Sequence, residues 1–162
     1  MVSRIIVIPS RRLCEVYEHV ARVAEECGVP DSFSSYLAWS PLKHCFMLVA
    51  VDARNTVLAE MDMIIDARGR AEIAYFSIPP CIIPKADAIA KLVATAVTIA
   101  RRHGAKTVAA KTLTQQDLAA LKPHPRLEDM SEADRHLEEA LEENGFEKLG
   151  EGEWLKKLAA TV

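Results

Sequence analysis

The feature that most constrains the fold is a long amphipathic helix between two strand-like runs. Its apolar face, at helical spacing within Pro84 to His103, consists of Ile89, Leu92, Val93, Ala96, Val97 and Ala100. Gly104 follows as a C-terminal cap. The strand-like runs are Ala71 to Ile78 before the helix and Lys106 to Lys111 after it. Because strand–helix–strand crossovers are right-handed, we predict that these two strands lie parallel in one sheet.

The rest of the chain supplies antiparallel strands and three more helical stretches. Two further strands, His44 to Asp52 and Thr56 to Asp66, join Ala71 to Ile78 through tight turns and predict a meander. The remaining strands are predicted at Ser3 to Ile8, Phe146 to Leu149 and Glu153 to Leu158. Helices are predicted from Leu13 to Cys27, from Pro30 to Trp39 and from a capping box at Ser131 to Asp134 up to Asn144-Gly145. This order predicts an α+β fold with one parallel crossover in a mixed sheet.

The segment from Thr114 to Met130 is polar and irregular, with Pro123 and Pro125. It is long for a connection between two elements, so we expect it to be partly helical, at Gln115 to Leu121, or functional.

Length and charge exclude several classes of protein. The 162 residues suffice for one compact domain, which we place at residues 1–162. The net charge of −3 offers no global basic field for nucleic acid. No apolar run approaches the roughly 20 residues that span a bilayer, and the first apolar stretch is too short for a signal peptide. We therefore expect a cytoplasmic protein with no nucleic-acid or membrane partner.

The four cysteines are Cys14, Cys27, Cys45 and Cys81. They form no C-x-x-C pair and have no histidine at ligand spacing, so we expect no metal site. We expect buried, reduced thiols. The alternative is one or two disulfides, which intracellular proteins of hyperthermophiles tolerate.

The order of elements and three local features resemble the GNAT N-acetyltransferase superfamily. AEIAYFSIPP (residues 71–80) is similar to the family's fourth strand, in which an acidic residue begins a run with a Val-x-Pro-like end. Residues 86–108 resemble its central helix, Gly turn and fifth strand, and residues 142–158 its closing helix end and hairpin. The resemblance implies a GNAT-like, mixed and mostly antiparallel sheet with splayed central parallel strands and flanking helices. A V-shaped gap would then separate Ala71–Ile78 from Lys106–Lys111.

The resemblance also implies that acetyl-CoA or another acyl-CoA fills this gap. Its pantetheine arm would bond to the strand near Ser77 and Ile78. Its pyrophosphate would lie on the following loop, at a helix N-terminus where backbone amides and the dipole suit an anion. The family's loop signature is Gln or Arg, two residues, Gly, one residue, then Gly or Ala. Counting from Pro80 places these positions at Ile83, Ala86 and Ala88; counting back from Gly104 shifts them by one.

This loop departs from the signature at the positions that touch phosphate. Ile83 has no polar group, Ala86 replaces a glycine, and Pro84 lacks an N–H donor. Asp87 would bring a negative charge close to the pyrophosphate, which Lys85 would offset in part.

The catalytic candidates are Glu72 and Tyr75. The resemblance implies that Glu72, near the start of its strand, deprotonates the amine, and the alternative is an exposed carboxylate after a turn. The position at which many family members carry an acidic Tyr is Leu141, which cannot transfer a proton. Tyr75 could replace it if its side chain points into the gap; otherwise it is a core or edge aromatic.

Two further acidic residues, Glu60 and Asp62, alternate with Met61 and Met63 in the neighbouring strand. We expect a solvated face for the carboxylates, with binding of a cationic acceptor as the alternative, and core positions for the methionines.

The resemblance therefore predicts an acyl-CoA-dependent N-acyltransferase that acetylates a primary amine on a small molecule or peptide. The first alternative is a catalytically inactive GNAT-fold protein with a binding, regulatory or assembly role. A second is an unrelated α+β domain with a similar order of elements. A homodimer is also compatible with the Met- and Val-rich strands and the terminal hairpin.

Overall fold

The computed structural model describes residues 1–28 and 41–159. Its elements, in chain order, are β1 (Arg4–Pro9), α1 (Arg11–Glu26), β2 (Leu42–Val51), β3 (Val57–Asp66), β4 (Arg70–Ser77), α2 (Ala86–Arg102), β5 (Thr107–Lys111), α3 (Gln115–Ala120), α4 (Leu127–Glu143), β6 (Glu147–Gly150) and β7 (Glu153–Lys157). The helix predicted at Pro30 to Trp39 lies outside the described residues.

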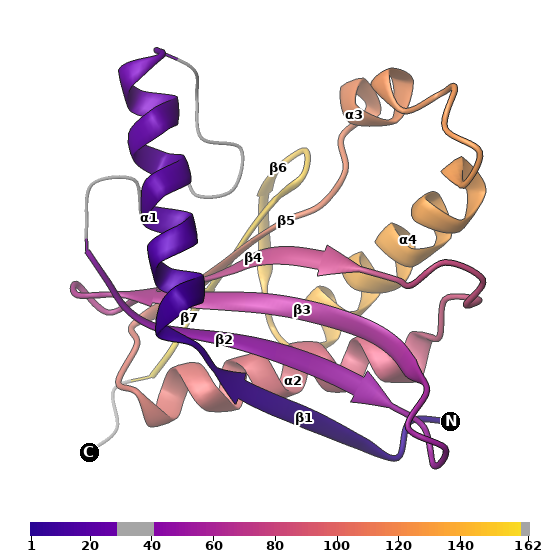
Figure 1. Ribbon diagram of the computed structural model, residues 1–162, viewed down its shortest axis with the longest axis horizontal. Helices are drawn as coiled ribbons and strands as arrows, with labels where there is room; N and C mark the ends of the chain where they lie inside the picture. Colours follow the sequence, from indigo (N-terminus) through magenta and orange to yellow (C-terminus); the bar gives the residue numbers. More distant parts are fainter. Residues whose placement is uncertain (29–40, 160–162) are drawn as a thin grey trace.

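The described strands form one seven-stranded sheet in the order β1-β2-β3-β4-β5-β7-β6 (Figure 1). Neighbouring strands are antiparallel except for β4 and β5, which the α2 crossover makes parallel. The predicted mixed α+β fold is therefore confirmed.

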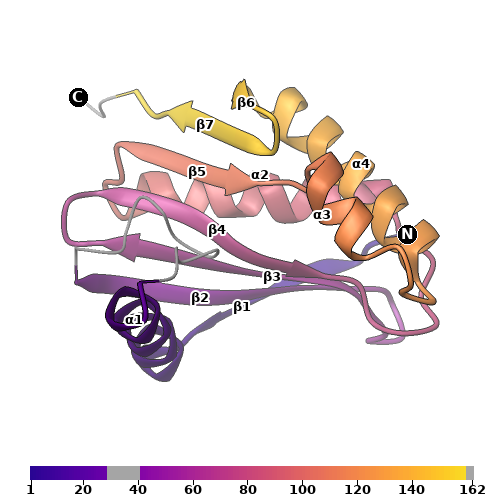
Figure 2. The ribbon, with the colours of Figure 1, turned by 90° about the horizontal axis from the view of Figure 1, so that it is seen from above.

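Helices cover both faces of the sheet (Figure 2). α2 packs against β1, β2 and β3 on one face and contacts α4 at its side, whereas α1 packs against β2 on the opposite face. The main core lies under α2, where Met61 and Met63 are fully buried, as predicted. A smaller cluster under α1 contains Leu42 and Ile64. Within the described residues, no helix has the length and apolar character needed to cross a membrane.

α4 begins at Leu127, so the predicted capping box at Ser131 is wrong. The Asp134 carboxylate turns away from its own helix and accepts the backbone N–H of Leu113 at 2.8 Å. A capping box occurs instead at the start of α3, between Thr114 and Asp117. α3 therefore bears out the expectation that this connection is partly helical.

A disulfide joins Cys14 of α1 to Cys45 of β2. The two residues face each other in the small cluster under α1, with their Cα atoms 5.5 Å apart, as a disulfide requires. Cys27 and Cys81 are free and exposed. The expectation of four buried, reduced thiols is thus wrong, because only the tertiary fold brings residues 31 positions apart together.

We expect reduction of this bond, or the pair of substitutions Cys14→Ala and Cys45→Ala, to lower the free energy of unfolding by about 3 kcal/mol. Chemical denaturation with and without reductant measures the change. The matched control replaces Cys27 and Cys81 by serine, which should leave stability unaltered. Titration of four free thiols in the oxidised, unfolded chain would contradict the assignment.

Candidate functional site

β4 and β5 separate halfway along the sheet. Their pairing runs from Arg70 opposite Thr107 to Ile73 opposite Ala110, whereas β4 continues to Ser77. The pairing of β4 with β3 shifts by one residue at the same level, between Asp62 and Met63. Such a bulge increases local twist. The expected splaying of the two parallel strands is confirmed.

A cavity of about 870 Å³ opens where the strands separate. β4 forms one wall from Ile73 to Ile78, and the segment from Lys111 to Thr114 forms another. α3 and α4 close the far side with Ala120, Leu121, Met130, Ala133 and Leu137. Its size and largely apolar lining suit a small organic ligand.

Polar side chains gather on the α1 face of the sheet beside this cavity. Tyr17 of α1 donates its hydroxyl hydrogen to Asp62 Oδ2 at 2.8 Å, and Ser77 donates to Glu60 Oε1 at 3.1 Å. Tyr75, which lines the cavity, is opposite Asp62 in the sheet. Asp62 is only 8% exposed, so the prediction of a solvated carboxylate face is wrong for this residue. The cover provided by α1 explains the difference, because α1 is distant in sequence.

We call Glu60, Asp62 and Glu72 the acidic row. Burial is the largest influence on the pKa values of Asp62 and of its partner Tyr17. It raises the pKa of Asp62, and the charge of Glu60 acts in the same direction, whereas the hydrogen bond from Tyr17 opposes both. Burial, followed by the charge of Asp62, raises the pKa of Tyr17, which therefore remains a protonated donor. A buried carboxylate of this kind is stabilised by a cation.

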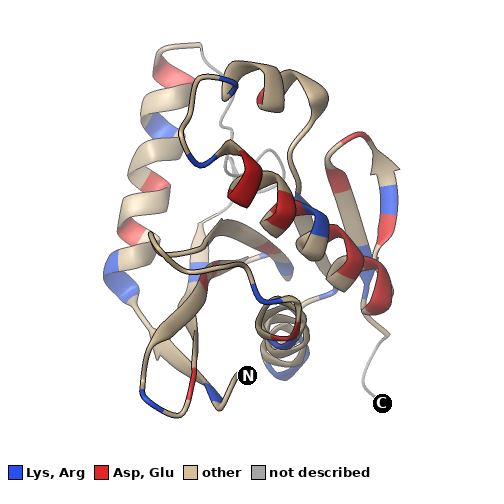
Figure 3. Cartoon of the chain, turned by 90° about the vertical axis from the view of Figure 1, so that its right-hand side faces the viewer, with Lys and Arg blue, Asp and Glu red and all other residues tan. Residues whose placement is uncertain are grey.

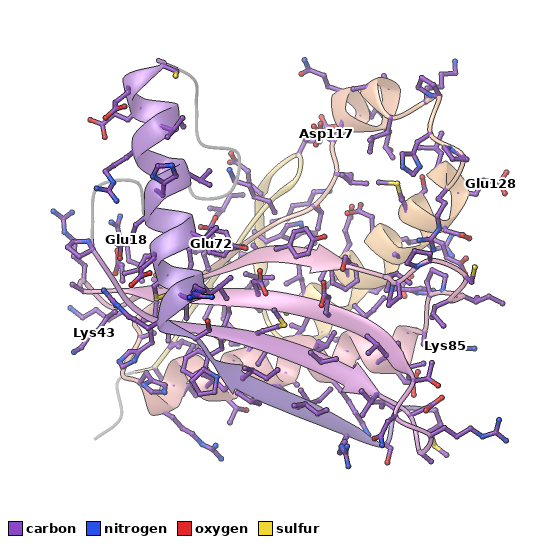
Figure 4. All side chains as sticks on the ribbon, in the orientation of Figure 1. Glu18, Lys43, Glu72, Lys85, Asp117 and Glu128 are labelled. Atoms are coloured by element: carbon purple, nitrogen blue, oxygen red, sulfur yellow. A yellow bond between two sulfur atoms is a disulfide. The ribbon has the colours of Figure 1, made fainter. Side chains whose placement is uncertain are left out.

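Glu72 lies in the same part of the sheet, between Ile64 of β3 and Ala109 of β5. It is 1% exposed, so the alternative of an exposed carboxylate after a turn is wrong. Its side chain is labelled in Figure 4, and its charge is the smallest of the causes that raise the pKa of Tyr17. The cavity wall begins at the next residue, Ile73.

The predicted cofactor-binding residues divide into two groups. Ser77 and Ile78 line the cavity. The other four lie outside its lining, namely Ile83, Lys85, Ala86 and Ala88. The Ile83 side chain is 67% exposed, whereas Ala88, in the first turn of α2, is fully buried.

Asp87 occupies the first turn of α2 and accepts the backbone N–H of Val2 through Oδ2 at 3.1 Å. The N–H of Val2 is the main cause, with that of Ala88, of a pKa below the ordinary range for this carboxyl. The positive end of α2 therefore faces a carboxylate of the chain itself. This helix N-terminus therefore does not fit a pyrophosphate.

α4 is linked to the ends of both splayed strands. Asp134 reaches Leu113, beyond β5, and Arg126 donates from Nη1 to the carbonyl oxygen of Ile78, beyond β4, at 3.3 Å. Arg126 also pairs with Asp129 at 3.5 Å. Sequence reasoning missed both links, since Asp134 resembled a helix cap and Arg126 lay in an irregular segment.

Asp134 gives the site a predicted pH dependence. Burial, with the charge of Glu138, raises its pKa from 3.8 to about 6, so its ionisation opposes folding between those pH values and above. Asp134→Asn keeps an acceptor for Leu113 and should raise stability by about 1 kcal/mol at pH 7.5, after allowance for partial exposure, with little change at pH 4. Thermal unfolding at both pH values tests this, with exposed Glu142→Gln as the control. Equal effects at both pH values would contradict it.

Leu141 is fully buried in the main core, so it takes no part in proton transfer. Tyr75, by contrast, is 43% exposed and lines the cavity. The structure thus places Tyr75 at the cavity, on β4, whereas Leu141 lies on α4.

Comparison with known proteins decides the fold. No protein-family model matches the sequence, and no curated protein does. Among solved structures, the aminoglycoside 6'-N-acetyltransferase from Enterococcus faecium superposes with a TM-score of 0.50 at 14% identity, over 97% of this chain and 99% of that one. The chain has the GNAT N-acetyltransferase fold.

A second solved structure, an acetyltransferase of the GNAT family from Staphylococcus aureus Mu50, matches 96% of this chain and all of its own length, with a TM-score of 0.46 at 9% identity. At 14% identity the Enterococcus structure establishes the fold alone.

Proposed function

We propose that this chain is an N-acyltransferase that moves an acyl group from an acyl-CoA to a primary amine. The observation that carries the proposal is the separation of β4 from β5 beyond Ile73 and Ala110, with a cavity of about 870 Å³ at that point. A sheet that loses a strand pair in its middle leaves backbone groups to be satisfied by another molecule.

The free edge of β4 is suited to the amide groups of a pantetheine arm. Backbone groups from Ala74 to Ile78 border the cavity and would bond to the arm as a neighbouring strand would. The thioester at the end of such an arm supplies an acyl carbon that is open to attack by an amine. Backbone amides near Ser77 and Ile78 would polarise its carbonyl.

The acidic row on the α1 face would receive the amine. Asp62 and Glu60 attract an ammonium group, and the buried Glu72 accepts its proton, directly or through water. The hydroxyl of Tyr75 donates a proton to the leaving sulfur. A small molecule or a peptide with a free amine fits this chemistry. The Enterococcus relative acts on aminoglycosides, which makes polyamino sugars one group to test.

The test is a transfer assay with acetyl-CoA and a panel of amines, comprising aminoglycosides, linear polyamines and peptides, with calorimetric titration of acetyl-CoA and CoA. We expect binding and release of free thiol that depends on the amine. If neither acetyl-CoA nor CoA binds at millimolar concentration, the proposal is refuted.

Two observations favour a second function, that of an inactive GNAT-fold binding or assembly module. Asp87 occupies the helix end where a pyrophosphate would lie, and Leu141 is core. This alternative predicts that amines or peptides bind the acidic row without any turnover of thioester. Binding of an amine with no thiol release, in the assay above, would establish it.

A further inference from the structure

We infer that the chain recognises its donor through the pantetheine thioester arm alone and leaves the ADP portion of CoA without protein contacts. This inference rests on the proposed function and narrows it: the donor class is a pantetheine thioester of any origin. The two halves of the donor site differ. One is shaped to hold the arm, and the other is unsuited to a pyrophosphate.

The half that would hold the arm is well formed. The free edge of β4 and the segment after β5 enclose the cavity, and α4 is attached to both through Arg126 and Asp134. Gly152 closes this wall, with the Thr112 backbone N–H donating to its carbonyl oxygen at 3.0 Å. The arm therefore has a defined path along β4.

The half that would hold the pyrophosphate offers few donors. Three of the eight residues between β4 and the start of α2, Pro79, Pro80 and Pro84, are prolines without an N–H. The N–H of Ile82 donates to the carbonyl oxygen of Pro79 at 3.3 Å. Ile83 presents a hydrocarbon side chain to solvent. The loop therefore has fewer free amides to offer an anion than a loop without prolines.

The N-terminus of α2, which follows this loop, already carries the negative charge of Asp87. The carboxylate of Asp87 lies in the first turn of α2, where its lowered pKa keeps it charged, and is fixed by Val2. A phosphate at this position would meet a negative charge in place of a free helix N-terminus.

The charges around the cavity also disfavour a polyphosphate. Its lining includes five carboxylates, on Asp117, Asp129, Asp134, Glu151 and Glu153. Among the described residues, the lysines and arginines in the lining are Lys111 and Arg126, and Arg126 is paired with Asp129. Figure 3 shows how acidic residues dominate α4. A polyphosphate at this rim would be repelled.

The decisive experiment compares acetyl-CoA with S-acetylpantetheine, which has the same thioester arm and no phosphate. Acetyl-CoA should bind and react no better than S-acetylpantetheine, because no charge-assisted bond to phosphate is lost when the ADP portion is removed. A site that held the pyrophosphate by two such bonds would prefer acetyl-CoA by about 100-fold. Preference of that size would overturn the inference and leave the proposed function standing, whereas absence of binding and transfer with both donors would overturn both.

Ionic strength gives an independent readout. Binding of acetyl-CoA should stay constant or tighten as salt rises from about 20 to 300 mM, since screening reduces repulsion by the carboxylates. Weakening of acetyl-CoA binding by salt, with acetylpantetheine unaffected, would overturn the inference.

Asp87→Asn tests the charge at the helix end, and its amide can still accept the N–H of Val2. We expect this variant to bind acetyl-CoA several-fold more tightly and acetylpantetheine as before. Glu15→Gln, on an exposed position of α1, removes the same charge at a distance and should change neither. Equal gains for both donors in Asp87→Asn would overturn the role assigned to this carboxylate.

Discussion

Glu72→Gln should lower kcat/KM for acyl transfer by about 100-fold or more, because an amide of the same shape cannot accept a proton. Glu72 is buried and directly precedes Ile73, the first residue of β4 in the cavity wall, and we propose that its carboxylate accepts the proton of the bound amine. Steady-state kinetics between pH 6 and 9, with the best amine of the panel, measure the loss. The residual rate should rise with pH as free amine becomes abundant in solution.

Glu60→Gln is the matched control for Glu72→Gln, since it makes the same change on the neighbouring strand. Glu60 would attract the ammonium group without accepting its proton, so this variant should raise KM and leave kcat nearly unchanged. Thermal unfolding of both variants separates catalytic loss from loss of fold. Activity within about threefold of wild type in folded Glu72→Gln would show that Glu72 is not the base.

Gly152→Ala should destabilise the chain by about 4 kcal/mol, combining backbone strain with overpacking. Gly152 has a φ of +73°, which side chains disfavour. A Cβ built there would lie 2.6 Å from the carbonyl oxygen of Thr112 and 2.8 Å from Cγ2 of Thr114. The first of these atoms belongs to backbone on the cavity wall, so the contact is not relieved by rotation of a side chain. Urea denaturation gives the free energy directly.

Gly150→Ala is the control, because it adds the same methyl group to the same hairpin. The nearest atom to a Cβ at Gly150 is Glu153 Oε2 at 3.9 Å, and its φ is outside the left-handed region. We expect a change below about 1 kcal/mol there. Similar losses in both variants would show that any side chain in the hairpin is harmful, and the specific contact with Thr112 would be rejected.

Local sequence patterns sufficed for most elements. The apolar face of α2 and its Gly104 cap predicted both the helix and its parallel crossover, since these signals depend on neighbours three or four residues away. The capping motif at Ser131 misled, because the same residue types also occur inside helices. The Asp134 carboxylate, inside α4, accepts instead the backbone N–H of Leu113, 21 residues earlier in the chain.

The candidate site was predictable where it depends on β4 itself. Tyr75, Ser77 and Ile78 could be placed at the gap because the strand and its neighbours could be identified. The burial of Asp62 and the disulfide could not, since both depend on how α1 is docked over the sheet. Arg126 reaches Ile78 across 48 positions of sequence. Contacts between residues so far apart in the chain leave no local periodicity in the sequence.

The sequence by itself determined the order of the elements, the parallel crossover and the departure of Ile83, Pro84 and Asp87 from a phosphate-binding loop. These are properties of residue type and short spacing. The tertiary structure decided what the departure means, by binding Asp87 to Val2, by opening β4 from β5 beyond Ile73 and by covering Asp62 with α1. Each of these depends on which distant groups meet, and packing of the whole sheet, not any one segment, fixes that.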